Sequence, residues 1–261
     1  MCLLLLALNT VPGRPWLLLG NRDEFHARPT APAQAWAQTP AIVGGRDLKA
    51  GGSWLALHRE GRYAAVTNVR SGLPASAPRS RGELVGDFVA GSAVPGDYAA
   101  AVAARRDDYG PFNLIVGDGS TACLVSSIDG QPTSLASGIH VFSNGLPAHE
   151  WPKMRRLREH FLALVRDREN HAAAILGRTS QVDAALLDLL FDVEQPDDTD
   201  LPDTGIGIDL ERRLAPIFIR GEAYGTRAST LAYARADGGL VLLERRFGPN
   251  AAPLGESLIE I

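Results

Sequence analysis

The 261-residue sequence has few cysteines and no long apolar run, and each shortage excludes a class of protein. Two cysteines, Cys2 and Cys123, cannot build a disulfide framework, and neither lies in a pattern with zinc-ligand or haem-attachment spacing. No stretch reaches the roughly 18 apolar residues of a membrane-spanning helix. The net charge of −4 disfavours a general nucleic-acid binder, because such proteins are normally basic. We expect a reduced, cytoplasmic protein with no membrane span, no bound metal and no nucleic-acid partner.

The rest of the composition is that of an ordinary globular protein, with 45% hydrophobic and 21% charged residues. A chain of this length buries enough surface to fold without a disulfide or a metal. No repeat or linker-like segment divides it, so residues 1–261 are interpreted as a single domain. The apolar run at 3–8 is shorter than the roughly 7–15 residues of a signal-peptide core, so it is interpreted as a buried strand.

Pairs of apolar segments flank turn residues along the chain, which is the pattern of antiparallel hairpins. The predicted pairs are 2–8 with 16–20, 54–58 with 63–69, 112–117 with 121–128, and 229–235 with 240–247, and 139–143 is a further strand. Apolarity in the first pair is continuous rather than alternating, so both of its strands are expected to be covered on both faces.

Helical patterns lie between these hairpins. The predicted helices are 81–90, 97–107, 153–168 and 183–191. The arginine-rich face of 153–168 is interpreted as solvated, with contact to an anionic ligand as the alternative. Segment 192–203 holds six acids and no base, which predicts a solvated loop. Hairpins at both ends and helices in the middle predict an α+β fold, in which two antiparallel sheets pack together beneath helices.

Cys2 is the first candidate for chemistry. Initiator methionine is usually removed when the second residue is small, so the mature chain is expected to begin at Cys2. That residue would then carry a thiol with a pKa of about 8.5 and an α-amine with a pKa of about 7.7–8.0. The amine can accept the thiol proton and later return it to a leaving amine. The alternative is a small residue that only begins a buried strand.

Four polar residues, Asn21, Arg22, Asp23 and Glu24, directly follow the second apolar strand. If the first two strands form a hairpin, residue 2 and residues 21–23 lie side by side at one end of a sheet. An aspartate there can hold the α-ammonium, and an arginine can stabilise the thiolate. An exposed turn with an ion pair is the alternative interpretation.

Two asparagines lie at strand ends, Asn68 after segment 63–67 and Asn144 after segment 140–143. Amide and backbone N–H groups at such places can form an oxyanion hole, although turn formation is the commoner use of asparagine. Arg227 lies among small residues in a loop that suits either an anion or a simple turn. The histidines show no metal-ligand spacing, so no metal site is predicted.

These motifs together resemble the NRDE family, also called the TANGO2 (transport and Golgi organisation 2) family. Each motif is weak alone, and their order along nearly the whole chain carries the resemblance. The motifs are Met1-Cys2, Asn21-Arg22-Asp23-Glu24, Gly44-Gly45-Arg46-Asp47, Gly51-Gly52-Ser53-Trp54, Thr67-Asn68-Val69-Arg70, Ser80-Arg81-Gly82-Glu83, Phe112-Asn113-Leu114, Ser143-Asn144-Gly145, Trp151-Pro152-Lys153 and Tyr224-Gly225-Thr226-Arg227.

The family in turn looks like the N-terminal-nucleophile (Ntn) hydrolases of the choloylglycine and penicillin V acylase type. That resemblance implies a four-layer αββα sandwich of two antiparallel sheets, with Cys2 opening a central strand. It also implies that Cys2 is the nucleophile, that Asp23 binds the nucleophile's amine, and that Asn68 and Asn144 bind the oxyanion.

The arginines depart from the acylase pattern. The acylases carry an arginine about three positions before the aspartate, whereas Arg22 directly precedes it here. Arg227 is a motif residue of the family but has no clean counterpart in the acylases. We assign Arg22 to the catalytic set, and we assign Arg227, Asn21 and Glu24 to substrate binding.

The resemblance implies a cysteine hydrolase that cleaves the C–N amide bond of a small molecule without a required cofactor. The same family also suggests an alternative, because its relatives are associated with haem movement between compartments. In that reading the chain binds haem without catalysis, with Cys2 or a histidine as the iron ligand. Binding of acyl-CoA or lipid, with the helix at 153–168 contacting the anion, is a further alternative. The sequence makes no prediction about the oligomeric state.

Overall fold

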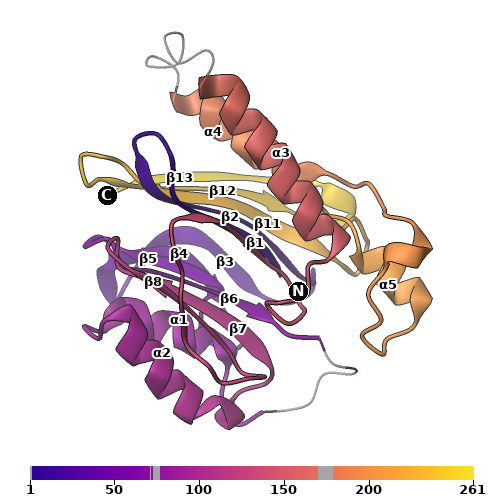
Figure 1. The fold of residues 1–261 in the computed structure, drawn as a ribbon, viewed down its shortest axis with the longest axis horizontal. Coiled ribbons are helices and arrows are strands. Elements are labelled where there is room, and N and C mark those ends of the chain that lie inside the picture. Colours follow the sequence, from indigo (N-terminus) through magenta and orange to yellow (C-terminus); the bar gives the residue numbers. More distant parts are fainter. Residues whose placement is uncertain (1, 71, 73–76, 170–178) are drawn as a thin grey trace.

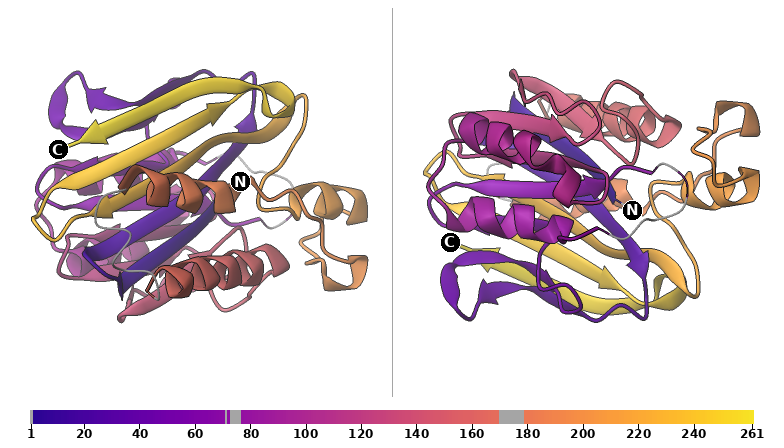
Figure 2. Two further views of the ribbon diagram at one scale, coloured as in Figure 1. Left: turned by 90° about the horizontal axis from the view of Figure 1, so that it is seen from above. Right: turned by 90° about the horizontal axis from the view of Figure 1, so that it is seen from below.

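Antiparallel sheets packed face to face form the centre of the fold in the computed structural model (Figure 1). The structure describes residues 2–70, 72, 77–169 and 179–261. Helices cover the outer face of each sheet, which Figure 2 shows from above and from below. The predicted α+β fold with αββα layers is therefore confirmed.

The first sheet contains both ends of the described chain. Its strands are β1 (Cys2–Val11), β2 (Arg14–Phe25), β10 (Gly138–Phe142), β11 (Tyr224–Ala234), β12 (Leu240–Phe247) and β13 (Pro253–Glu260). Their order in the sheet, within the described residues, is β10-β1-β2-β11-β12-β13. The strand that begins at Cys2 therefore lies between β10 and β2, inside the sheet, as the resemblance implied.

The second sheet is built from the middle of the chain. Its strands are β3 (Thr30–Trp36), β4 (Thr39–Asp47), β5 (Leu55–His58), β6 (Tyr63–Asn68), β7 (Phe112–Gly117), β8 (Ala122–Ser126) and β9 (Thr133–Ser134). In the described residues they pair in chain order from β3 to β9. The predicted hairpins β5–β6 and β7–β8 are confirmed.

Two helices pack on each sheet. They are α1 (Arg81–Ala90) and α2 (Pro95–Ala104) on the second sheet, and α3 (Pro152–Glu169) and α4 (Thr179–Asp188) on the first. A shorter helix, α5 (Ile208–Leu214), lies beside the sandwich (Figure 1). None of the helices in the described ranges is both long and apolar enough to cross a membrane.

The first strand packs against two apolar layers because its side chains alternate between faces. Leu3 and Leu5 contact the cluster beneath the helices that includes Phe161 of α3. Leu4 and Leu6 contact the cluster between the two sheets. Both faces of β1 are therefore covered, as the continuous apolar pattern predicts.

Some elements differ from the sequence prediction. Strand β2 continues past residue 20 to Phe25, because β11 pairs with it as far as Tyr224. The pattern does not indicate β3, β4 or β13, since β3 and β13 are largely exposed and all three contain proline. The polar motif at 21–24 therefore lies inside a strand and not in an exposed turn.

The acidic segment 192–203 is only partly solvated, so the loop prediction is wrong in part. Asp192 and Glu194 each form an ion pair of 2.5 Å with Arg156 of α3. A 3₁₀ turn spans Asp198–Asp200. The chain itself thus neutralises part of the basic face of α3, and an anionic ligand is not needed to explain that face.

The start of α1 is fixed in place by a capping box and a close backbone contact. Ser80 Oγ accepts a hydrogen bond from the Gly82 N–H at 3.3 Å, and Glu83 Oε1 accepts one from the Ser80 N–H at 3.1 Å. The Ser53 N–H donates to the Gly82 carbonyl at 3.1 Å. A Cβ atom on Gly52 would lie 2.4 Å from the Gly82 carbonyl carbon. The helix start therefore packs directly on the loop that follows β4.

Glu244 of β12 provides a test of how the two sheets are joined. It is buried, and its Oε1 accepts a hydrogen bond of 2.8 Å from the Ala33 N–H of β3. Burial raises the pKa of the Glu244 carboxyl. An acid with a raised folded-state pKa stabilises the fold at low pH, and that contribution is lost as the pH rises through that pKa.

We therefore expect Glu244→Gln, which keeps an acceptor for Ala33, to increase the free energy of unfolding at pH 7. The variant should also weaken the pH dependence of stability above pH 4.5. Glu244→Ala should lower the free energy of unfolding by about 1–3 kcal/mol, because it leaves the Ala33 N–H without an acceptor. Urea unfolding at several pH values measures both, and equal effects of the two substitutions would contradict this account.

Candidate active site

Strand pairing brings the predicted catalytic residues to one end of the first sheet. Cys2 at the start of β1 pairs with Arg22 of β2. On the other side of β1, Leu4 pairs with Phe142 of β10. Continuing this antiparallel register by two residues brings position 144 beside position 2. The hairpin prediction that placed residue 2 next to residues 21–23 is therefore confirmed.

Asp23 is buried beside Arg22 and is held by the neighbouring strand. Its Oδ1 accepts a hydrogen bond of 2.7 Å from Thr226 Oγ1, and its carbonyl accepts one of 3.1 Å from the Tyr224 hydroxyl. Burial raises the pKa of the Asp23 carboxyl, while the charges of the amino terminus, Lys153 and Arg22 and the Thr226 hydrogen bond oppose this rise. A buried carboxylate among cations is suited to holding an ammonium group.

Lys153 is a site residue that the sequence analysis missed. It lies in the first turn of α3, is 4% exposed, and donates from Nζ to the Leu214 carbonyl at 3.0 Å. Its positive charge lowers the pKa of Asp23. The available signal was composition, because Lys153 is one of only two lysines and lies in the motif Trp151-Pro152-Lys153.

Asn144 lies where the segment after β10 crosses to the second sheet. Its Nδ2 donates a hydrogen bond of 2.8 Å to the carbonyl of Asn68, the last residue of β6. The preceding Ser143 carbonyl accepts a hydrogen bond from Thr67 Oγ1 at 2.8 Å. An amide nitrogen carries two hydrogens, so Asn144 keeps a second donor beyond its bond to Asn68. The two predicted oxyanion asparagines are thus brought together.

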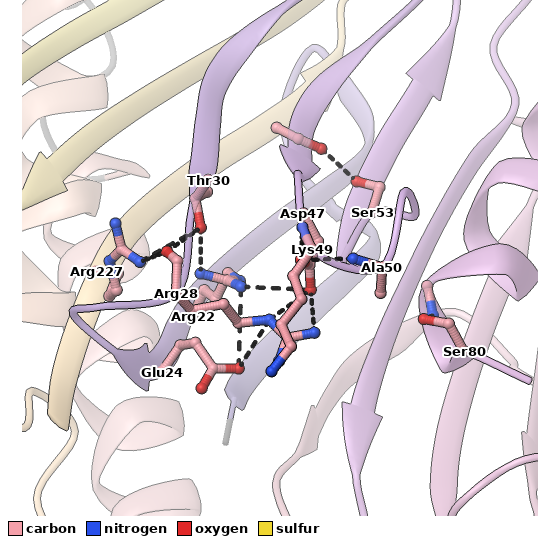
Figure 3. Close-up of polar contacts among 12 residues, drawn as sticks. Arg22, Glu24, Arg28, Thr30, Asp47, Lys49, Ala50, Ser53, Ser80 and Arg227 are labelled. Carbon is pink, nitrogen blue, oxygen red and sulfur yellow. Dashed lines mark hydrogen bonds and ion pairs between the residues drawn. The ribbon is translucent and has the colours of Figure 1, made fainter. Parts of the chain in front are cut away.

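Arg22 is buried but only loosely held. Its side chain is 6% exposed and lies 4.0 Å from carboxylate oxygens of both Glu24 and Asp47. It also donates a long hydrogen bond of 3.4 Å to Thr30 Oγ1 and stacks on the Trp54 ring at 4.4 Å. Figure 3 shows Arg22 at the centre of these groups. The guanidinium therefore lies among acceptors without the short contacts of a closed ion pair.

Arg227 holds the turn that follows β2. It lies in a bulge of β11, since Thr226 pairs with Asp23 and Ala228 with Arg22. Its Nη1 donates to the carbonyls of residues 25 and 28 and to a hydroxyl of β3 (Figure 3). Burial and the nearby Arg22 lower its pKa. These contacts account for the Arg227 side chain through the fold, and its role in substrate binding stays a prediction.

The other predicted substrate-binding residues differ in position. Asn21 is buried, donates from Nδ2 to the Leu190 and Ile217 carbonyls, and accepts from Ser229 Oγ at 2.6 Å. Its polar atoms are therefore used within the protein. Glu24 instead lines a cavity, so of the two it is better placed to meet a ligand.

This cavity, here called the arginine cavity, lies at the end of the sandwich and has a volume of about 360 Å³. Its lining includes Arg22, Glu24, Asp47, Asn68 and Arg81. These residues come from both sheets and from the start of α1. The charged lining suits a small polar ligand. Among the described residues, no group of His, Cys, Asp and Glu side chains has the arrangement of a metal site.

The fold is also that of a solved hydrolase. The structure titled Caenorhabditis elegans N-acylethanolamine-hydrolyzing acid amidase (NAAA) ortholog superposes with a TM-score of 0.51. The match covers 88% of this chain and 92% of that chain at 12% sequence identity. At this identity the likeness concerns the fold alone, and it identifies the sandwich as Ntn-hydrolase-like.

The sequence matches one family along almost its whole length. The model of the family described as transport and Golgi organisation 2 matches residues 1–249. A Bos taurus transport and Golgi organization protein 2 homolog is 32% identical over 245 residues, covering 88% of this chain and 85% of that protein. The Drosophila melanogaster transport and Golgi organization protein 2 is 26% identical over 268 residues, covering 94% and 91%. The chain therefore belongs to the transport and Golgi organisation 2 family.

Proposed function

We propose that this protein is an N-terminal cysteine hydrolase that cleaves the C–N amide bond of a small molecule. The observation that carries the proposal is the pairing of Cys2 with Arg22, next to buried Asp23, at the arginine cavity. Residues directly opposite each other on antiparallel strands present their side chains on the same face. The thiol of Cys2 therefore belongs on the face of Arg22, which lines the cavity.

The proposed reaction begins after Met1 has been removed. The α-amine of Cys2 takes the thiol proton, and the thiolate attacks the carbonyl carbon of the amide. The C–N bond then breaks, the α-ammonium returns a proton to the leaving amine, and the acyl group stays on sulfur as a thioester. A water molecule, deprotonated by the α-amine, hydrolyses the thioester and releases a carboxylic acid.

The surrounding residues have separate roles in this proposal. Asp23 holds the α-ammonium, and Lys153 helps to keep the Asp23 carboxyl ionised. Arg22 stabilises the thiolate, because a cation next to a thiol favours its charged form. The second Nδ2 hydrogen of Asn144 stabilises the oxyanion of the tetrahedral intermediate, and Asn68 completes this part of the site.

A screen of N-acyl amides tests the proposal. Purified protein should release free amine from at least one amide, and the Cys2→Ala variant should release none above background. The alternative function, binding of haem or an acyl-CoA without catalysis, predicts that neither protein releases amine. It also predicts that Cys2→Ala still binds the ligand, unless Cys2 is itself an iron ligand.

The Thr226 hydrogen bond predicts a change in pH dependence. Thr226→Val removes the bond that lowers the Asp23 pKa, so that pKa should rise further above its usual value. Since Asp23 must be ionised to hold the α-ammonium, the acidic limb of the kcat/KM profile should move to higher pH. Well above that limb, activity should change less than about tenfold.

Thr226→Ser is the matched control, because serine keeps a hydroxyl for both Asp23 and the Ile219 N–H. Its pH profile should stay close to that of the unmodified protein. A Thr226→Val profile that keeps the original acidic limb, in a variant that is folded, would rule out this role for the hydrogen bond.

A further inference from the structure

A second cavity begins where the arginine cavity ends. Asn68 lines the arginine cavity, and the next two residues, Val69 and Arg70, line a cavity of about 650 Å³. Asn144 lies at this boundary, because its Nδ2 donates to the Asn68 carbonyl and its own carbonyl accepts from the Arg70 N–H. Gly145, which follows Asn144, lines the second cavity. The two cavities therefore lie on opposite sides of the asparagine pair.

The second cavity, here called the Trp151 cavity, has apolar walls that include Leu146, Trp151 and Ile128. Its buried cation, Arg70, is already neutralised, since its Nη2 lies 3.1 Å from Glu211 Oε2. The Arg70 guanidinium also stacks on the Trp151 ring at 5.0 Å. This cavity thus offers apolar surface and aromatic surface, with no unbalanced positive charge from Arg70.

The rim of the Trp151 cavity is acidic. Glu150, Asp200 and Asp203 all belong to its lining. Of these, Glu150 is paired with Arg158 of α3. Carboxylates at the rim repel an anionic group, so an acidic part of a ligand is disfavoured here.

The arginine cavity has the opposite preference. Its lining contains Arg22, Arg28 and Arg81, and buried Arg22 has only contacts of 3.4 Å and longer to polar groups of the described residues. Residues 80–82, at the start of the ten-residue helix α1, also line this cavity. The N-terminal end of a helix carries a partial positive charge. Together these groups favour a negatively charged group.

From this division we infer that the substrate is an amide that joins an apolar group to a carboxylate-bearing group. The apolar group occupies the Trp151 cavity, the carboxylate occupies the arginine cavity, and the scissile carbonyl lies at the Asn68–Asn144 contact between them. The inference rests on the proposed hydrolase function and specifies its substrate class. It follows from the charges and walls of the two cavities on either side of one pair of asparagines.

Binding to the full-length Cys2→Ala variant tests the inference without turnover. Calorimetry would compare N-decanoylglycine with N-decanoylethanolamine, which lacks the carboxylate, and with N-acetylglycine, which lacks the long apolar group. We expect N-decanoylglycine to bind at least about tenfold more tightly than the neutral amide. It should bind at least about 100-fold more tightly than N-acetylglycine.

Substitutions in each cavity assign the two halves. In the Cys2→Ala background, Arg81→Gln should weaken binding of N-decanoylglycine by about tenfold and leave N-decanoylethanolamine unchanged. Leu146→Trp, which fills part of the Trp151 cavity, should weaken both decanoyl ligands by about tenfold. The matched controls are Arg59→Gln and Leu258→Trp, since both residues are exposed and lie outside both cavities.

The outcomes separate this inference from the proposed function. Equal affinities for the acidic and neutral decanoyl amides, or a Leu146→Trp variant that binds both decanoyl ligands normally, would overturn the inference. Preferential hydrolysis of neutral amides by the unmodified protein would also overturn it while supporting the hydrolase. Binding that follows the predicted pattern, with no turnover of any amide by the unmodified protein, would contradict the hydrolase and support the assignment of the cavities.

Discussion

Replacing Cys2 with alanine is expected to reduce amide hydrolysis by about 10⁴- to 10⁶-fold, the range seen when a covalent nucleophile is removed. Without the thiol no acyl-enzyme can form, and the groups around the site can only bind the substrate. The α-amine stays in Cys2→Ala, so the variant removes the nucleophile and keeps the proposed base. The measurement is the rate of amine release from the best amide found in the screen.

Cys123 provides the matched control for this prediction. It is 3% exposed on β8, and burial raises the pKa of its thiol, so the reactive thiolate is disfavoured. Cys123→Ala should therefore leave kcat/KM essentially unchanged. Cys2→Ala protein that hydrolyses the amide at the original rate would mean that Cys2 is not the nucleophile.

Replacing Asn144 with alanine is expected to lower kcat by about 10²- to 10³-fold, which is the usual cost of losing one oxyanion donor. The effect should fall mainly on kcat, because the negative oxygen exists only in the transition state and the tetrahedral intermediate. The hydrogen bond from Asn144 to the Asn68 carbonyl is lost as well, so the folding of the variant must be measured separately. Steady-state kinetics and urea unfolding on the same preparation give both quantities.

Asn113 offers a comparison within the same network. It is also a buried asparagine, and its Nδ2 donates to the carbonyls of Ser143 and Gly145 on either side of Asn144. Asn113→Ala should loosen this segment and reduce kcat by less than the Asn144 variant does. A folded Asn144→Ala protein with an unchanged kcat would exclude Asn144 from the oxyanion hole.

The fold could be predicted where local pattern and pairing agree. The continuous apolar segments at 2–8 and 16–20 specify a hairpin, and the hairpin alone places residue 2 beside Arg22. The family resemblance then supplies Asp23, Asn68 and Asn144, which lie at this end of the sandwich. Prediction fails for the exposed edge strands β3 and β13, because edge strands lack the apolar alternation that marks a buried strand.

The site could be predicted only in part, because several of its features depend on contacts between distant segments. Lys153 reaches the site because α3 docks on the first sheet, and no pattern near residue 153 indicates this. The Trp151 cavity is built from five separate parts of the chain, and sequence spacing does not show that they meet. The contacts of Arg227 depend on a bulge in β11 that pairing rules alone do not place.

The most direct test of the central claim is the intact mass of the purified protein before and after brief treatment with a thiol alkylator. Our account predicts a mass without Met1 and a single fast alkylation at Cys2, with buried Cys123 reacting much more slowly. Peptide mapping would assign the modified residue. A retained Met1, or a Cys2 that reacts no faster than free cysteine, would contradict the activated N-terminal nucleophile on which the proposed function depends.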